Sequence, residues 1–465
     1  MKKILLIISL FCFQIHAQET YTVLGFEEYM GYVKRFHPLV RQAQIALTEG
    51  EVNLLKARGA FDPKLEVDFN QKTFQSTDYY NTMAATFKIP TWYGIELKAQ
   101  FEEASGYYLN PQNTVPDDGL YAAGVSVSLA QGLLINDRMA ALKQAKFYAQ
   151  QRKAERDLLV NQVLYQAALT YFDWLKAFRE YQVNDEFLEN AQIRFLAIKA
   201  SVDKGDKAAI DSVEAAITIN TRKLSVEKSQ LKLNKASLKL SNFLWLDSNL
   251  PLELKNSVVP DVYTLDRVDQ VLELDQVLDT NSLLQEHPKM LALGFKYKQL
   301  EVDKKLKLNK LLPVFNLEYN FLSQQTAPNT FNTSDYKSGV YFKMPLFLRK
   351  ERGDFNLAKL KLQDMTYEIA STRLTLSNKI KAMQQELSSL ERQQLLVKNV
   401  VNSYDQMLKA EERKLELGDS SLFLINSREN SLMDAQLKAV DLEFQFLEAK
   451  ANMFNNLALS PLEVQ

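Results

Sequence analysis

Long stretches of helical periodicity dominate the pattern of hydrophobic positions along the chain. Asp354 to Leu417 runs 64 residues without Gly or Pro, and its apolar residues recur at alternating steps of three and four. At 1.5 Å per residue, such a helix is roughly 100 Å long. It stops at Gly418, and a second stretch with the same rhythm runs from Ser421 to Ser460. The pattern therefore predicts a long antiparallel helical hairpin.

The first half of the chain predicts a second hairpin of the same kind. The 72 residues from Leu133 to Lys204 again contain no Gly or Pro. The break comes at Gly205-Asp206, where Gly can take the left-handed conformation that ends a helix. We expect the return helix to run from Ala208 to Leu246.

Polar-apolar alternation with a period of two, which is typical of strands, occurs in six runs. In the first run, Leu65, Val67 and Phe69 fall on one face, between charged or polar residues on the other. Each run has about 8 to 11 residues, the length of a tilted strand that crosses a bilayer. The runs are Lys64 to Thr73, Thr82 to Ile89, Ile95 to Glu102, Tyr121 to Leu129, Val314 to Phe321 and Tyr336 to Met344.

Shorter helices are expected before the strands in both halves. Thr22 is predicted to cap a helix through Phe36, and His37-Pro38 to start the next helix, which continues towards Arg58. His287-Pro288 repeats the His-Pro pair 250 residues later. Both histidines are expected to have structural roles at helix starts.

Matching positions indicate that the chain is duplicated. Pro63 and Pro313, each before an alternating run, are also 250 residues apart, whereas Arg138 and Arg352 are 214 apart. The second half is therefore shorter by about 36 residues, which corresponds to two strands. We predict a signal peptide at 1–17, a first repeat at 18–250 with about four strands at 64–129, a linker or equatorial segment at 251–282, a second repeat at 283–460 with two strands at 314–344, and a tail at 461–465.

The N-terminus and the composition indicate export. Lys2 and Lys3 precede an apolar run from Ile4 to Phe13, and cleavage is expected after Ala17. The single cysteine, Cys12, lies inside that segment, so the mature chain is expected to contain neither disulfides nor thiolate metal sites. The net charge of −1 gives no indication of nucleic acid binding. No apolar run after Phe13 approaches the roughly 20 residues of a membrane-spanning helix.

Taken in order, these features resemble the outer membrane efflux protein family, the TolC family. The resemblance rests on the signal peptide, the His-Pro pairs, the prolines before the strands and the Gly turns, and it covers nearly all of the mature chain. It implies an α+β membrane protein in which three chains close one β-barrel in the outer membrane and their helices form a barrel through the periplasm. It also implies an exit duct for an inner-membrane pump and its periplasmic adaptor, without a cofactor or catalysis.

The resemblance also implies site residues at the two helical turns. The turns would be periplasmic tips where the adaptor docks, and the acids just after the first turn would help to close the tunnel mouth. The second turn departs from the family pattern, because Ser420, Leu424 and Ser427 stand where some members carry a basic residue and two acids. The tip residues are Gly205, Asp206, Gly418, Asp419 and Ser420, the acids are Asp211 and Glu214, and Arg428 is a possible substitute for the base. The alternative is that these residues form ordinary turns and a solvated helix face.

Aromatic residues gather at the ends of the alternating runs. They include Tyr79, Tyr80, Trp92, Tyr93, Tyr107 and Tyr108. Belts at the two membrane interfaces would explain the concentration, and scattered turn aromatics are the alternative.

Two further questions remain open from the sequence, namely whether the chain is an adaptor and how many strands the barrel has. A periplasmic coiled-coil adaptor would share the long hairpins, but it should lack six membrane-length strands and should carry a compact β domain between the hairpin arms. The barrel itself has 18 strands if all six runs of each chain enter it, or 12 if the pair at 82–102 forms a hairpin cap. No catalytic constellation or phosphate-binding loop is visible, so an enzyme is not expected.

Overall fold

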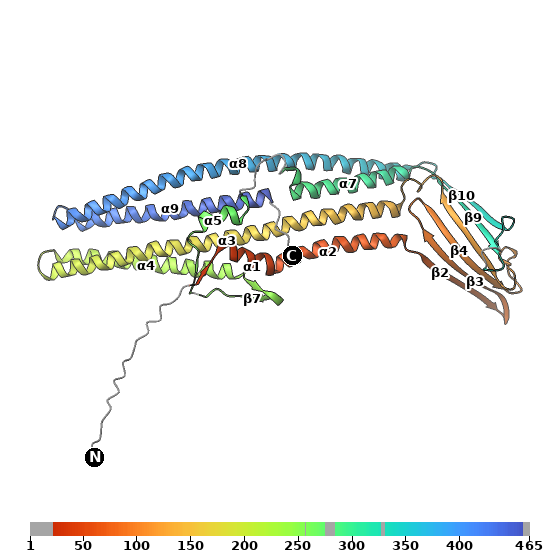
Figure 1. Ribbon diagram of the computed structural model, residues 1–465, viewed down its shortest axis with the longest axis horizontal. Helices are drawn as coiled ribbons and strands as arrows, with labels where there is room; N and C mark the ends of the chain where they lie inside the picture. Colours follow the sequence, from red (N-terminus) through yellow and green to blue (C-terminus); the bar gives the residue numbers. More distant parts are fainter. Residues whose placement is uncertain (1–21, 256, 275–283, 327–330, 459–465) are drawn as a thin grey trace, which may run out of the picture.

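The structure, a computed structural model, describes residues 22–255, 257–274, 284–326 and 331–458. The predicted signal peptide, the predicted tail and part of the predicted linker lie outside these residues. The described chain is elongated, with a sheet at one end and long helices that lead away from it (Figure 1).

Two long antiparallel hairpins form the helical part, as predicted. Helices α3 and α8 have 67 and 68 residues, and each turns back into a shorter helix at the end opposite the sheet. The first hairpin consists of α3 (Asp137–Asp203) and α4 (Ala209–Ser241), and the second of α8 (Arg349–Glu416) and α9 (Leu422–Leu457). Helix α4 ends before the predicted Leu246, because Trp245–Leu246 (β6) pairs with Leu250–Pro251 (β7).

All six alternating runs are strands of one antiparallel sheet. The strands are β2 (Lys64–Phe74), β3 (Thr77–Pro90), β4 (Ile95–Ser105), β5 (Leu120–Ser128), β9 (Val314–Ser323) and β10 (Tyr336–Lys343). Their spatial order is β10-β9-β5-β4-β3-β2, so β3 and β4 lie inside the sheet and not above it as a separate hairpin. Strands β10 and β2 are the two edges.

Two shorter helices accompany the sheet-side halves of the long ones. They are α2 (Pro38–Arg58), which packs on α3, and α7 (Pro288–Asn309), which packs between α3 and α8. Each begins at a His-Pro pair, where the histidine Nδ1 accepts a hydrogen bond from the amide two residues on. The repeated pair is therefore a helix cap in both halves.

The middle of the molecule is thickened by short elements around a core of α3. They are β1 (Thr22–Leu24), α1 (Phe26–Phe36), β8 (Val258–Pro260) and α5 (Thr264–Val271). The prediction that Thr22 caps the first helix is wrong, because Thr22–Leu24 pairs in parallel with Val258–Pro260 and α1 begins only after Gly25. The Tyr171 hydroxyl donates to the Leu24 carbonyl at 2.7 Å and fixes that strand against the core.

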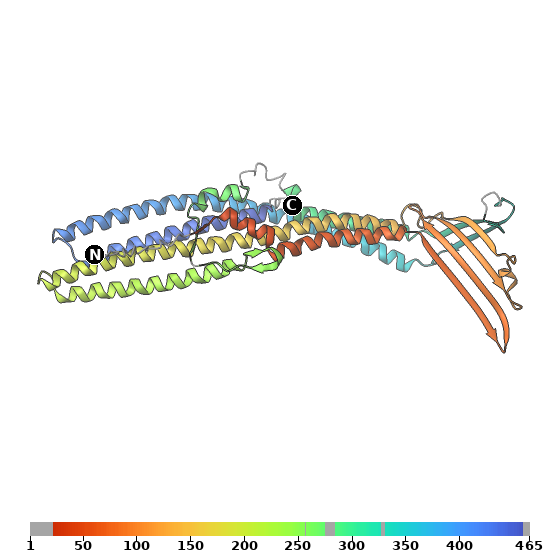
Figure 2. The same ribbon diagram turned by 60° about the horizontal axis from the view of Figure 1, so that its bottom comes forward.

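The long helices and the six-stranded sheet form one layer, and the short elements gather around its middle (Figures 1 and 2). Neighbouring helices follow the order α8-α9-α3-α4 in the half away from the sheet and α8-α7-α3-α2 in the half beside it. One edge therefore consists of β10 and α8, and the opposite edge of β2, α2 and α4.

Candidate functional site

The two faces of the sheet differ in character. Residues that are directly opposite on neighbouring strands have their side chains on the same face of the sheet. The register therefore places most of the apolar residues of the six strands on one face and most of the polar residues on the other. One face presents exposed apolar side chains, among them Leu65, Val67, Phe69, Phe87, Leu97, Leu317, Val340 and Phe342. A sheet with one broad exposed apolar face needs a lipid or protein surface to cover it.

The other face is polar and is crossed by ion pairs. Lys88 lies 2.5 Å from Glu66, and Lys98 lies 3.0 Å from Glu318. At the helix end of the sheet, Arg138 of α3 reaches Glu96 at 2.7 Å. Charged residues of both signs are typical of a water-filled barrel interior.

The aromatic residues singled out in the sequence lie at the two ends of the strands. At the helix end, Trp92 stacks on Phe61 with ring centroids 5.6 Å apart, and Tyr93 beside it is exposed. At the far end, Tyr79 contacts Tyr108 at 4.7 Å between centroids, and Tyr107 contacts Tyr108 at 4.9 Å; Tyr80 adjoins Tyr79 on β3. This placement fits two interface belts, and the role itself stays a prediction.

The first helical turn is a Schellman motif centred on Gly205. Gly205 has a positive φ of 82°, its amide donates to the Val202 carbonyl at 2.9 Å, and the Asp206 amide donates to the Ser201 carbonyl at 3.0 Å. Nothing lies within 4 Å of where a Cβ would stand on Gly205. Backbone conformation alone therefore favours glycine here.

The second turn repeats this geometry at Gly418, whose φ is 86°. The Gly418 amide donates to Leu415 at 3.1 Å, and the Asp419 amide donates to Lys414 at 2.9 Å. Beyond the turn, the Ser420 hydroxyl donates to the Glu411 carboxylate at 2.6 Å. Both turns lie at the same end of the molecule, opposite the sheet (Figure 1).

The candidate charged residues near these turns make contacts within the chain. Glu214 accepts a hydrogen bond from the Asn426 amide at 3.0 Å, which joins α4 to α9. Arg428 lies 3.9 Å from Glu411 inside its own hairpin. Asp211 sits half-buried in the first turn of α4 and forms no ion pair with the described residues. The structure therefore does not bring Asp211, Glu214 and Arg428 together as one cluster.

A buried charge cluster between the hairpins was not predicted. Glu429 of α9 is 1% exposed, and both of its oxygens accept from the Arg194 guanidinium of α3, at 2.9 and 3.2 Å. Arg222 of α4, itself 5% exposed, lies 3.5 Å from Glu429 and donates to Asn430 at 2.6 Å. One carboxylate thus ties α9 to both helices of the other hairpin.

Burial favours the neutral form of the two capping histidines. Burial lowers the pKa of His287 and of His37 below the ordinary value. In His287 the Nδ1 atom accepts from the Lys289 amide at 3.1 Å, and Nε2 lies 3.1 Å from the Asn456 carbonyl. A proton on Nδ1 would abolish the cap.

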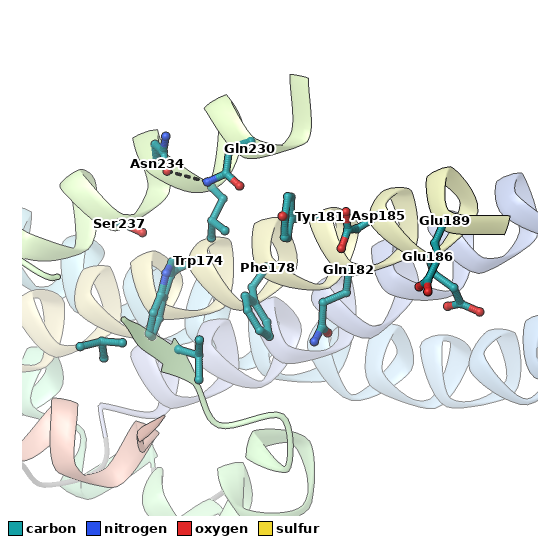
Figure 3. Close-up of a pocket in the computed structure, with 13 residues that line it drawn as sticks. Trp174, Phe178, Tyr181, Gln182, Asp185, Glu186, Glu189, Gln230, Asn234 and Ser237 are labelled. Carbon is teal, nitrogen blue, oxygen red and sulfur yellow. Dashed lines mark hydrogen bonds between the residues drawn. The ribbon is translucent and has the colours of Figure 1, made fainter. Parts of the chain in front are cut away.

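A hollow of about 660 Å³ lies between α3, α4 and β8 (Figure 3). Trp174 and Phe178 of α3 line one side, and on α4 the Gln230 amide donates to Asn234 at 2.9 Å.

The described residues include no group of three or more His, Cys, Asp or Glu that could hold a metal ion. No helix among them is long and apolar enough to cross a membrane.

Comparison with known proteins shows the fold. No family model matches the chain, and no curated protein matches it. Among solved structures, the open state of the MtrE outer membrane channel of Neisseria gonorrhoeae superposes with a TM-score of 0.66 at 14% identity, over 93% of this chain and 88% of that one. The CmeC outer membrane channel of Campylobacter jejuni superposes with a TM-score of 0.63 at 12% identity, over 93% of this chain and 85% of that one. The outer membrane protein VceC of Vibrio cholerae superposes with a TM-score of 0.63 at 11% identity, over 92% of this chain and 95% of that one.

Proposed function

We propose that this chain, which has the fold of the outer membrane channels just described, is itself an outer membrane exit duct. That fold is the one that the resemblance to the TolC family predicts. The duct would be a passive, water-filled conduit of an efflux or type I secretion system, and the energy for transport would come from an inner-membrane pump. The observation that carries the proposal is the six-stranded sheet, with one apolar face, one polar face and two free edges.

The faces of the sheet determine how the molecule would sit. The apolar face would contact lipid and the polar face would line the lumen. The helices would then extend into the periplasm, with the Gly205 and Gly418 turns farthest from the membrane. The predicted signal peptide agrees with this location in the cell outer membrane.

The free edges support a ring of three copies. A sheet that is open at β2 and β10 leaves unpaired backbone groups, which cannot be exposed in a bilayer. On the same edge as β2, α4 carries an apolar residue at every seventh position, each between 55 and 67% exposed: Ile210, Ile217, Leu224, Leu231 and Leu238. On the opposite edge, α8 exposes Leu396, Val400 and Met407. A head-to-tail contact of one edge with the other closes into a ring and covers both.

Three copies would close a barrel of 18 strands, since each contributes six (three times six). The position of β3 and β4 between β2 and β5 supports this count over the 12-strand alternative. The barrel diameter grows roughly with the number of strands, so a barrel of 18 would leave a wide aqueous lumen.

The tips are the proposed contact with a periplasmic adaptor. The second turn exposes apolar side chains beside its glycine, Leu417 and Phe423. Asp211 and Glu214 would lie near the mouth of the helical tunnel. The adaptor would connect this end to the inner-membrane pump.

The alternative in which the chain is itself an adaptor has no support. Such a protein was expected to lack six long strands, whereas the sheet here has six strands of 8 to 14 residues. They stand at the end opposite the hairpin turns.

Native mass measurement in detergent, on protein from the outer membrane fraction, tests the assembly. Three chains are expected, and a monomer from the soluble periplasmic fraction would refute the proposal.

Single cysteines at Ile95, Leu97 and Phe101 on the apolar face of β4 should react with a membrane-soluble thiol probe and resist a charged one. Gln100→Cys, on the polar face of the same strand, is the matched control and should react with the charged probe. Ready labelling of all three apolar sites by the charged probe would remove β3 and β4 from the barrel.

A further inference from the structure

We infer that an oblique row of lysines on the polar face of the sheet makes the outer part of the duct attract anions. This inference rests on the proposed function, because it needs the polar face to line a lumen. The solutes concerned are small inorganic anions and solutes that carry carboxylate or phosphate groups.

The strand register brings the lysines into one row. Lys64 of β2 is directly opposite Lys88 of β3, and Lys88 is directly opposite Lys98 of β4. The row continues through Gly124 of β5 and Asn320 of β9 and ends at Lys337 of β10. We call Lys64, Lys88, Lys98 and Lys337 the lysine row.

The row runs obliquely across the wall of the barrel. Lys64 is the first residue of β2, at the end where α2 leads into the sheet. Lys337 is the second residue of β10, whose other end leads into α8, so it lies at the end away from the helices. A solute that moves through the barrel would therefore pass lysines at successive depths and not one narrow ring.

Like charges directly opposite each other destabilise a sheet, so the row is not explained by stability. Two lysines have partners, since Lys88 pairs with Glu66 and Lys98 with Glu318. Lys64 and Lys337 form no ion pair with the described residues. A locally unfavourable arrangement points to a functional role.

The balance of charge around the row is positive. Four carboxylates lie in the flanking rows. Three are paired, Glu66 with Lys88, Glu318 with Lys98, and Glu96 with Arg138, whereas the fourth, Asp335, is opposite Leu322 and two residues before Lys337. The four lysines of the row together with Arg138 therefore outnumber these four carboxylates by one positive charge per chain, or three in three copies (three times one). Lysines and arginines that line a pore favour anions because the low-dielectric wall concentrates their field.

The test measures the potential near the row directly. Thr86→Cys places a thiol on the polar face of β3, directly opposite Glu66 and Gln100 and next to the row. The measurement is the labelling rate of this thiol by an anionic reagent divided by its rate with a cationic reagent. This ratio should be higher in the complete channel with both lysines present than in the double variant Lys64→Gln with Lys337→Gln. The expected fall in the anionic-to-cationic rate ratio is about threefold or more.

Lys255→Gln is the control, because it removes a lysine from the connection between β7 and β8, far from the sheet. It should leave the rate ratio unchanged. In planar bilayers under a salt gradient, the double lysine variant should also shift the reversal potential towards cation preference. Unchanged labelling and unchanged selectivity in a conducting double variant would overturn the lysine inference and leave the exit duct standing. If the unaltered protein forms no channel, the proposed function and the inference both fail.

Discussion

The buried carboxylate of Glu429 offers the sharpest test of how the two hairpins are held together. Glu429→Gln keeps the size of the side chain but removes the charge that faces Arg194 and Arg222. Breaking a buried ion pair from one side costs about 3–5 kcal/mol, because a charge is left buried without a partner. The lower end applies here, since Arg194 keeps Glu412 at 3.5 Å and Arg222 keeps Asn430.

Hydrogen exchange of the α9 amides around Glu429 measures this cost. A loss of about 3 kcal/mol should raise exchange by local opening by up to about a hundredfold, while the sheet amides stay protected. Glu412→Gln is the matched control, because the Glu412 side chain is 45% exposed and its contact with Arg194 should contribute less than about 1 kcal/mol.

An apolar replacement of the whole cluster separates the charge effect from simple misfolding. Arg194→Met and Arg222→Met combined with Glu429→Leu should recover most of the lost protection, because no charge is then left buried. Equal exchange in Glu429→Gln and Glu412→Gln would refute the reasoning, since it would mean that the buried carboxylate contributes no more than an exposed one.

Three further outcomes are expected. Burial holds the pKa of His287 below its ordinary value near 6.5. The neutral His287 side chain therefore contributes its full stability above that pH, and this contribution is lost as the pH falls through the lowered pKa of the folded chain. His287→Asn, which can still cap α7, should therefore flatten the change in thermal midpoint between about pH 7 and 5, and an unchanged slope would exclude this histidine as the cause. Gly205→Ala should destabilise the first tip by about 1–2 kcal/mol through its positive φ, whereas Gly205→Asn should cost less; equal denaturation midpoints for both would contradict the left-handed turn. If Asp211 and Glu214 ring the mouth, Asp211→Asn with Glu214→Gln should lower cation selectivity in planar bilayers, and unchanged selectivity would make them an ordinary helix face.

The elements of this fold were predictable because each has a strong local signal. The absence of Gly and Pro over 64 residues and the clean alternation in runs such as Lys64 to Thr73 need no knowledge of distant contacts. The pairing of Thr22 with Val258 has no such signal, because it joins short segments far apart in the sequence.

The functional residues were harder to predict than the elements. The two tip glycines could be found because a left-handed turn favours Gly. Glu429 could have been noticed as an acid on the buried stripe of α9, between Ile425 and Leu432. Its partners Arg194 and Arg222 follow only from the packing of three helices. The lysine row likewise depends on the register of neighbouring strands, which alternation alone does not determine.

The change of partner along α3 and α8 has a mechanical consequence. Each of these helices is continuous from the sheet to the tip. Helices α2 and α7 pack beside them only in the half next to the sheet, and α4 and α9 pack beside them in the other half (Figure 1). The largest buried cluster of the described residues lies where the partners change, and it joins the start of α2 to the ends of α4 and α9 through α1 and α3. The core at the middle of the molecule therefore connects the two helix pairs and resists bending at the point where the pairing itself is interrupted.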